Sequence, residues 1–275
     1  MVKVFAPAKL NLSLHVTGQR SDGYHVLDSL VAFVDVGDQI TAELANETCL
    51  SVTGPFAQGV PTDGSNLAVK AAKACGVDLE LTLDKRLPPS SGIGGGSADA
   101  AATLRAAMRL GGPKITEDHA LLLGADVPVC LASKSTRMQG IGDMLTPVTL
   151  PALHIVMVNP RVEVSTPDVF ARLDRKDNHP MPEVLPKWPD SLAFVDWLGT
   201  QRNDLQNPAA KAAPEVAAVL VALALSPEVL LSRMSGSGAT CFGVYPDRLA
   251  AEAAAAQLAQ SNPWWWVKAA STLPA

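Results

Sequence analysis

The stretch Pro88-Pro-Ser-Ser-Gly-Ile-Gly-Gly-Gly-Ser-Ala98 holds four glycines within five residues and stands between a predicted strand and a predicted helix. Residues Leu79 to Asp84 alternate apolar and polar side chains, as a half-buried strand does. Ala98 to Leu110 contains no proline or glycine and ends at Gly111-Gly-Pro113, which predicts a helix with a glycine C-cap. The free N–H groups and the positive dipole end at the start of such a helix attract anions. The stretch therefore predicts a phosphate-binding turn.

Two common phosphate-binding patterns do not fit this turn. A P-loop requires Lys-Ser or Lys-Thr after the glycines, and neither pair follows here. The dinucleotide fingerprint requires glycine where Ser97 stands. Glu117, at a suitable distance downstream, is better explained as an acidic residue in the first turn of a helix that begins after Thr116. A merely flexible loop is the plain alternative, although such loops rarely lie so tightly between a strand and a helix.

The bulk composition limits the possible functions. The 275 residues are 48% hydrophobic and 18% charged, enough for one large domain or two ordinary ones. A net charge of -5 argues against sequence-independent nucleic-acid binding, whereas a phosphorylated small molecule needs only a local cradle. The four cysteines are far apart without a Cys-x-x-Cys pair, so they indicate neither a zinc site nor a redox pair and fit a reducing cytoplasm.

Neither a secretory signal nor a membrane span is predicted. Met1 to Lys9 has no long apolar core. The most apolar stretch, Val216 to Leu225, is about half as long as a membrane span and has a Pro-Glu pair on either side, so a buried helix is expected there. We therefore expect a soluble, cytoplasmic protein.

The N-terminal half contains strands, turns and short helices. Residues 2–16 alternate as a strand does, with Lys9 and Asn11 on the polar face, where a solvated lysine is the plain interpretation. Asn66 is predicted to cap a helix over residues 68–75. Asp126 is compatible with a simple helix N-cap.

The proline-rich stretch 146–151 is the candidate domain boundary. Beyond it the sequence predicts a strand over 154–158, a charged surface loop over 174–190, a second glycine loop over 235–239, a strand over 240–245, a helix over 248–260 and a strand over 264–268. Helices and strands mix without regular βαβ alternation. This pattern predicts an α+β fold in two lobes, residues 1–150 and 151–275.

Three stretches together resemble the motifs of the GHMP small-molecule kinases, which include galactokinase, homoserine kinase and mevalonate kinase. They are Pro7-Ala-Lys-Leu-Asn-Leu12, Pro88 to Ala98, and Met234-Ser-Gly-Ser-Gly-Ala-Thr240. One glycine loop is weak evidence, but several blocks in the same order are strong. The resemblance implies the family's two-lobed fold, with a ribosomal-protein-S5-domain-2-like N-terminal lobe, a ferredoxin-like C-terminal lobe and the active site between them.

Further blocks resemble the branch of the family that phosphorylates the 2-hydroxyl of a diphosphocytidyl methylerythritol with ATP, in the non-mevalonate isoprenoid pathway. These blocks are Lys9-Leu-Asn-Leu12, Gly23-Tyr-His25, Gly124-Ala-Asp-Val-Pro128 and Asn203-Asp-Leu205. Phosphoryl transfer needs bound phosphates, a neutralising cation and an aligned nucleophile. The resemblance implies that Asp126 accepts or orients the hydroxyl proton and that Lys9 lies beside that hydroxyl.

The resemblance also implies two sets of binding residues. Backbone amides of the glycine turn would hold the ATP phosphates, and Asn66 and Lys85 would lie near the adenosine. The predicted ATP set is Asn66, Lys85, Pro88, Pro89, Ser90, Ser91, Gly92, Ile93, Gly94, Gly95, Gly96, Ser97 and Ala98. Mg²⁺ would arrive with ATP and be held mainly by its phosphates, so no metal-ligating side chains are predicted.

In the predicted substrate set, Tyr24 and Phe170 would sandwich the cytosine, and His25 would select it by hydrogen bonds, although a structural role is the plain alternative for His25. The remaining members are Asn11, Thr166, Ser235, Gly236, Ser237 and Gly238.

The chain departs from the family pattern at five residues in three places. Ser90-Ser91 stand where relatives commonly carry glycine or alanine, which is tolerable if only backbone amides matter. Ala98 stands where many carry serine, so that position offers no hydroxyl to phosphate. Val129-Cys130 replace aromatic residues that are frequent in relatives.

Other functions remain as alternatives. A GHMP kinase for homoserine or mevalonate would not need the base-stacking residues Tyr24, His25 and Phe170. A nucleotide-binding sensor without catalysis would be expected to have lost Lys9 or Asp126, and both are present. An interaction module leaves the two glycine loops unexplained. The sequence does not indicate the oligomeric state.

Overall fold

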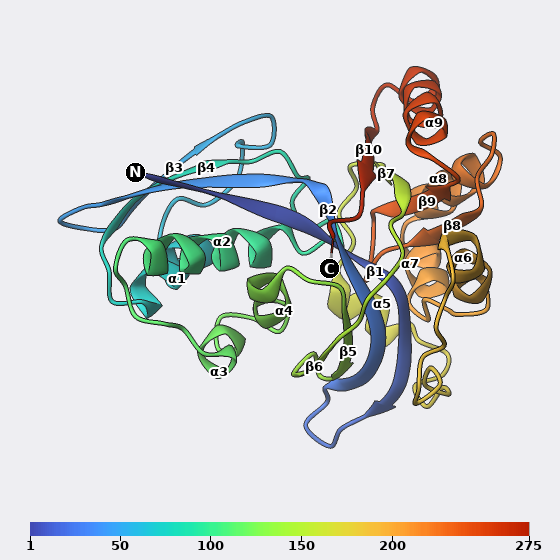
Figure 1. Cartoon of the computed structure of the whole chain (residues 1–275), viewed down its shortest axis with the longest axis horizontal. Coiled ribbons are helices and arrows are strands. Elements are labelled where there is room, and N and C mark those ends of the chain that lie inside the picture. Colours follow the sequence, from blue (N-terminus) through green and yellow to red (C-terminus); the bar gives the residue numbers. More distant parts are fainter. Residues whose placement is uncertain (275) are drawn as a thin grey trace. The chain divides into compact units, whose positions relative to one another are not determined.

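The computed structural model describes residues 1–274 (Figure 1). In chain order the elements are β1 (Val2–Gln19), β2 (His25–Leu44), β3 (Cys49–Thr53), α1 (Leu67–Ala74), β4 (Leu79–Asp84), α2 (Gly95–Arg109), α3 (Glu117–Leu121), α4 (Val127–Ala132), β5 (Thr136–Gly140), β6 (Met144–Pro147), β7 (His154–Asn159), α5 (Thr166–Ala171), α6 (Ser191–Gly199), α7 (Gln206–Ala212), α8 (Pro214–Ala224), β8 (Leu231–Met234), β9 (Cys241–Tyr245), α9 (Arg248–Ser261) and β10 (Trp266–Ser271).

The chain forms two compact units. Unit 1 contains residues 1–9, 36–89 and 94–133, and unit 2 contains residues 10–35, 90–93 and those from 134 onward. This division does not coincide with a boundary at residue 150, because β1 and β2 are 18 and 20 residues long and each contributes to both units. The assignment of the family's domains to residues 1–150 and 151–275 stays a prediction.

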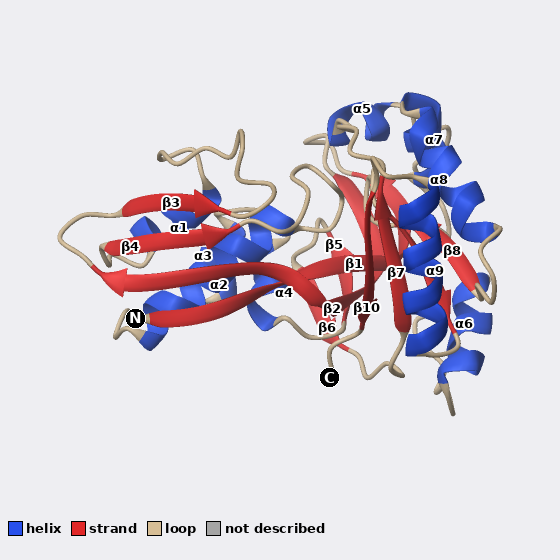
Figure 2. Ribbon diagram, turned by 90° about the horizontal axis from the view of Figure 1, so that it is seen from above, coloured by secondary structure: helices blue, strands red, loops and turns tan. Residues whose placement is uncertain are grey.

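Unit 1 is built on β2, β4 and β3, with α1 and α2 side by side against these strands (Figures 1 and 2). Strand β4 is antiparallel to β2 and parallel to β3, and its alternate leucines are buried, as the sequence predicted. The predicted cap of α1 is confirmed, because the Asn66 side chain accepts the Ala68 N–H at 2.9 Å. Helix α2 begins at Gly95, three residues before the predicted start, since Gly94 already leaves the loop in a left-handed conformation.

Unit 2 contains the antiparallel sheet β10–β7–β9–β8, and α9 runs along it (Figure 2). The strands predicted over 154–158 and 240–245 and the helix over 248–260 are confirmed as β7, β9 and α9. The last strand begins two residues later than predicted.

A buried helix was expected over residues 216–225, and helix α8 is buried on one face only. Its buried residues are Val216, Val219 and Leu223, which follow helical spacing, whereas Val221 and Leu225 are exposed. The apolar stretch therefore packs one face on the core of unit 2 and leaves the other face uncovered by the described residues.

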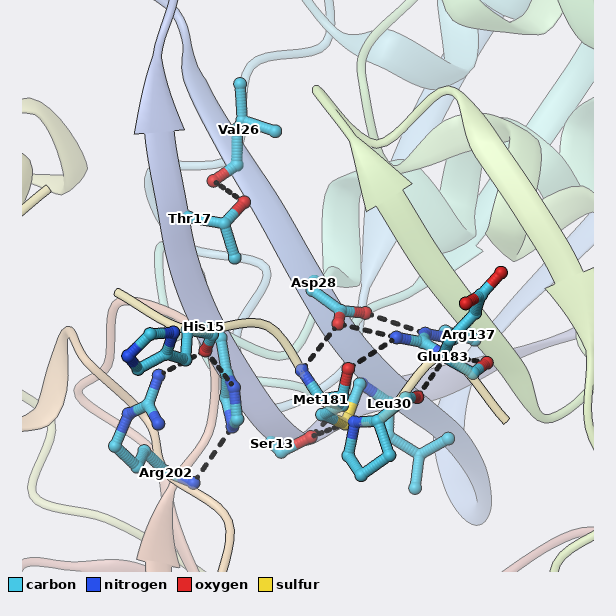
Figure 3. A network of polar contacts seen from close by, with 12 residues as sticks. Ser13, His15, Thr17, Val26, Asp28, Leu30, Arg137, Met181, Glu183 and Arg202 are labelled. Atoms are coloured by element: carbon cyan, nitrogen blue, oxygen red, sulfur yellow. Dashed lines mark hydrogen bonds and ion pairs between the residues drawn. The ribbon is translucent and has the colours of Figure 1, made fainter. Parts of the chain in front are cut away.

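The segment 174–190 contains no helix or strand within the described residues, as predicted, yet it is firmly attached to unit 2. Met181 is buried, its N–H donates to Asp28 Oδ2 at 2.8 Å, and its carbonyl accepts from Arg137 (Figure 3). Because the attachment uses backbone groups, it fixes the path of the segment without requiring secondary structure.

His15 attaches the same segment at a second point (Figure 3). Its Nδ1 lies 3.1 Å from the His179 carbonyl, and its Nε2 lies 3.2 Å from the Arg202 backbone nitrogen. A carbonyl only accepts and a backbone N–H only donates, so Nδ1 carries the hydrogen and the ring is neutral. Burial, and then the charge of Arg202, lower the pKa of His15, in agreement with a neutral ring.

Among residues 1–274, no helix is both long and apolar enough to cross a membrane, and no three His, Cys, Asp or Glu side chains are arranged to hold a metal ion. The four cysteines are free thiols, with Cys49 exposed and the others buried.

Candidate active site

In unit 1 the Lys9 ammonium nitrogen donates to Asp126 Oδ2 at 2.7 Å. Lys9 lies on β1 with its side chain 5% exposed, and the Asp126 side chain is 32% exposed. The lysine is therefore not a solvated strand residue. Asp126 does stand at the N-cap position of α4, but its side chain caps no described backbone N–H and pairs with Lys9 instead. A partly exposed carboxylate held by a buried ammonium is suited to proton transfer.

The Lys9 side chain runs against the glycine turn. A Cβ placed on Gly94 would lie 3.3 Å from Lys9 Cβ and 3.4 Å from Lys9 Cε, and Gly94 has φ of +65°. Both the backbone conformation and the close approach of Lys9 therefore favour glycine here. Cys130, one of the departures from the family pattern, is buried on the same side, with its sulfur 3.8 Å from that Cβ position.

Helix α2 starts at this turn with its first amides bare. No described side chain caps its N-terminus, and the first intrahelical bond there runs from the Ala98 N–H to the Gly94 carbonyl at 2.8 Å. The N–H groups of Gly95, Gly96 and Ser97 thus have no acceptor within the helix. They lie at the positive end of the helix dipole, where free N–H groups are suited to binding an anion, and this turn contacts Lys9.

Lys85, predicted near the adenosine, is buried in unit 1 between two carboxylates. Its Nζ donates to Asp38 Oδ2 at 2.5 Å and to Asp99 Oδ2 at 2.7 Å. Burial acts to lower the pKa of Lys85, but Asp99 and Asp38 outweigh it and raise that pKa, so the ammonium is charged. Asp38 and Asp99 were not singled out from the sequence, because nothing local marks residues 47 and 14 positions away as partners of this lysine. The adenosine contact of Lys85 stays a prediction.

The rest of the predicted ATP set is divided between the units. Asn66 uses its side chain as a cap and as a donor to the Pro61 carbonyl. Ser90 has φ of +48°, a conformation that favours glycine, which gives a physical reason for the glycine that many relatives carry there but not for the alanine. Pro88 and Ser91 are buried, whereas Pro89 is exposed.

In unit 2, residues 90–93 pack on the second glycine loop. The Thr240 N–H donates to the Ser91 carbonyl at 3.1 Å, and Ser235 Oγ donates to the Gly92 carbonyl at 3.0 Å. A Cβ on Gly92 would lie 2.6 Å from the Ser235 and Gly238 carbonyl oxygens, so the two backbones leave no room for a side chain. Two stretches far apart in the sequence are therefore held together by backbone contacts.

Asn203 supports the second glycine loop. Its Nδ2 donates to the carbonyls of Met234 and Gly236 at 2.8 and 2.9 Å. Residues 203–205 resembled a family motif, but the sequence did not indicate their role. These contacts show that Asn203 holds the backbone of the second glycine loop.

Several predicted substrate residues lie in contact within unit 2. Thr166 and Ser237 share a hydroxyl hydrogen bond of 2.7 Å. The Asn11 N–H donates to Ser235 Oγ at 3.0 Å, and its Nδ2 donates to Ser29 Oγ at 2.8 Å. Asn11 Oδ1 is buried and has no hydrogen-bond partner among the described residues. A buried acceptor without a partner is costly, so a ligand donor at this position is expected.

The cytosine sandwich between Tyr24 and Phe170 stays a prediction, and in the structure the ring that contacts Phe170 is that of His25. The His25 ring stacks on Phe170 with centroids 4.5 Å apart and an interplanar angle of 23°, while Tyr24 is 62% exposed. Burial, and then the charge of Lys176, lower the pKa of His25. His25 Nε2 is buried without a hydrogen-bond partner among the described residues, which leaves it free to contact a ligand.

Two family models match the chain. The model of the GHMP kinases N terminal domain matches residues 66–147, and the model of the GHMP kinases C terminal matches residues 191–263. A solved structure described as 4-(cytidine 5'-diphospho)-2C-methyl-D-erythritol kinase superposes with a TM-score of 0.81 and 30% identity over 100% of both chains. A homoserine kinase from Cytophaga hutchinsonii shares the fold, with a TM-score of 0.67 and 20% identity over 99% of this chain and 94% of its own. The predicted α+β GHMP kinase fold is thus confirmed, and it defines a class of small-molecule kinases.

Similar proteins assign the chain to one family within this class of kinases. Proteins named 4-diphosphocytidyl-2-C-methyl-D-erythritol kinase from Cereibacter sphaeroides and Paracoccus denitrificans are 53% and 52% identical to this chain. The alignments cover 97% and 98% of this chain and 98% and 96% of theirs. The chain belongs to the family of 4-diphosphocytidyl-2-C-methyl-D-erythritol kinases within the GHMP kinases.

Proposed function

We propose that this protein transfers the γ-phosphoryl group of ATP to the 2-hydroxyl of 4-diphosphocytidyl-2-C-methyl-D-erythritol, in the non-mevalonate isoprenoid pathway of the cytoplasm. The proposed substrate is supported by the names of relatives that are 53% and 52% identical to this chain. The observation that best supports phosphoryl transfer is the Lys9–Asp126 ion pair, which lies beside the uncapped N-terminal N–H groups of α2. The free thiols support a reducing compartment.

The residues of unit 1 suggest a role for each group in phosphoryl transfer. The amides of Gly95 to Ser97 would hold phosphate oxygens. The Asp126 carboxylate would take the proton of the 2-hydroxyl while that oxygen bonds to the γ-phosphorus and the bond to the β-phosphate oxygen breaks, releasing ADP. Lys9 would keep the carboxylate in place and offset negative charge as transfer proceeds.

Mg²⁺ would enter with the nucleotide and neutralise phosphate charge. Phosphate oxygens and water would hold most of its coordination sphere, since the ion keeps several waters and prefers hard oxygen ligands. Asp126 is already paired with Lys9, so we give the ion no protein ligand.

Recognition of the cytidine end is proposed for unit 2. Phe170 supplies a flat apolar surface, and the unpaired His25 Nε2 supplies a polar contact next to it. Homoserine and mevalonate have no aromatic base, so kinases for those alcohols would gain nothing from such a pair.

The test is ADP release in a coupled assay with ATP, Mg²⁺ and a panel of alcohols. We expect turnover with the diphosphocytidyl substrate and none above background with homoserine or mevalonate. ADP formed only with homoserine or mevalonate would refute the proposed substrate, and ADP formed with none of the alcohols would favour a sensor.

Replacing Phe170 or Tyr24 with alanine is expected to raise KM for the cytidine substrate by about tenfold, because stacking on a base contributes roughly 1–3 kcal/mol. KM for ATP should stay unchanged. The measurement is initial-rate kinetics with each substrate varied in turn.

Trp264→Ala is the matched control, since Trp264 is also aromatic and is 83% exposed in unit 2. A selective rise of KM for ATP in the Phe170 or Tyr24 variant would mean that the two nucleotide sites have been interchanged.

A further inference from the structure

Three buried charged side chains lie under the glycine turn of unit 1. Lys85 Nζ bonds both Asp38 Oδ2 and Asp99 Oδ2, and the three side chains are 5%, 0% and 5% exposed. One ammonium thus faces two carboxylates in a space that water hardly reaches.

The cluster connects the segments that frame the turn. Asp38 lies on β2, and its Oδ1 accepts the N–H groups of Arg86 and Leu87, where the chain leaves β4 towards the turn. Asp99 lies on α2. A Cβ on Gly95, the first residue of α2, would lie only 3.2 Å from Lys85 Nζ. The ammonium therefore lies next to the first residue of the helix whose N-terminal amides receive phosphate in the proposed function.

The charges of the cluster do not balance when both carboxylates are ionised. Asp99 Oδ1 is buried and has no hydrogen-bond partner among the described residues. The pKa of Asp99 is raised to about 7, and burial is the largest cause. The charge of Lys85 opposes the rise, and the charge of Asp38 adds to it. Cys130 of α4 also faces this region, but burial raises the pKa of its thiol to about 12, so it is neutral. Asp99 is thus the member of the cluster that can take up a proton.

We propose that Asp38, Lys85 and Asp99 form a positioning triad that fixes the glycine turn and, when Asp99 is protonated, removes the excess negative charge beneath the phosphate-binding amides. The proposal rests on the proposed function, because it assumes that a nucleotide polyphosphate binds at this turn. Lys85 then acts through the turn, and its ammonium need not contact the adenosine.

The triad makes two pH effects opposite in sign to those of an ordinary salt-bridged aspartate. Between the usual pKa of 3.8 and about 7, the folded protein binds more protons at Asp99 than the unfolded chain does, so stability falls as pH rises through that window. Nucleotide binding favours the same protonated form. Affinity should therefore fall as pH rises through about 7, and binding should take up a proton.

The experiment is calorimetric titration of the full chain with ATP and Mg²⁺ from about pH 6 to pH 8.5. We expect the dissociation constant of the wild type to rise by about tenfold across this range, the equivalent of a one-unit change in pKa on binding. In Asp99→Asn the dissociation constant should be independent of pH and close to the acid value of the wild type. Asp118→Asn, an exposed aspartate on α3, should behave as the wild type.

A second measurement counts the protons taken up when the nucleotide binds. Titrations of the wild type in buffers of different ionisation enthalpy report the protons taken up, and we expect uptake near pH 7.5. Asp99→Asn should abolish it and should raise the Tm above that of the wild type at pH 8, with a smaller difference at pH 5.

A wild-type affinity that does not change with pH, zero proton uptake, or a wild-type pH profile retained in Asp99→Asn would each overturn the triad proposal alone, because nucleotide would still bind. Absence of ATP binding in every variant would overturn the proposed function and the triad proposal together.

Discussion

Asp126→Asn is expected to lower kcat by about 100-fold or more, because the amide cannot accept the proton of the attacking hydroxyl. The fold should survive, since the Asp126 side chain caps no described backbone group of α4 and the amide oxygen can still accept from Lys9. Loss of a proton acceptor that acts in the transition state lowers kcat and kcat/KM together. The measurements are steady-state kinetics and calorimetric binding of ATP to the same preparation.

Lys9→Met provides the partner variant, and the double variant closes a cycle. Because the two side chains form one ion pair, their effects on kcat should not add. We expect the double variant to be about as slow as the slower single one. If Asp126→Asn turned over at the wild-type rate, Asp126 would not be the proton acceptor. If the effects of the two single variants on kcat were strictly additive, Lys9 and Asp126 would act independently.

The sequence predicted the backbone around this site better than its ionic contacts. Alternation identified β4, and Asn66 and Thr116 marked the starts of α1 and α3, because these signals act within a few residues. The length of α2 was underestimated at its N-terminus because glycines in the first turn look like loop. The apolar run of α8, with a Pro-Glu pair on either side, predicted a buried helix, but a helix at the surface of a domain buries only one stripe of side chains.

Contacts between residues far apart in the chain were either inferred from the family resemblance or not predicted at all. Local rules make Asp126 a helix cap, and a lysine 117 positions away takes its carboxylate instead. The roles of Lys9 and Asp126 came from the family motifs. The carboxylates around Lys85 have no local signature, and neither has Asp28, which pairs with Arg137. Such contacts form only when the tertiary structure brings distant strands together.

Arg137→Met is expected to lower the free energy of unfolding by about 3–5 kcal/mol, the usual cost of leaving one member of a buried ion pair alone. Arg137 Nε and Nη2 donate to Asp28 at 2.8 and 2.7 Å, and the two side chains are 8% and 2% exposed (Figure 3). Arg137 also donates to the carbonyls of Met181, Pro182 and Glu183. The measurement is urea unfolding, together with the rate at which a protease cleaves segment 174–190.

Arg175→Met is the matched control, because its partner Asp177 lies on the same segment and both side chains are exposed. Exposed pairs contribute little, so this variant should unfold as the wild type does. Asp28→Asn combined with Arg137→Met removes both buried charges and should recover part of the loss, since the largest cost of the single change is the unpaired carboxylate. If the double variant were instead no more stable than Arg137→Met alone, the lost contacts to the carbonyls of segment 174–190, and not the unpaired charge of Asp28, would dominate the effect.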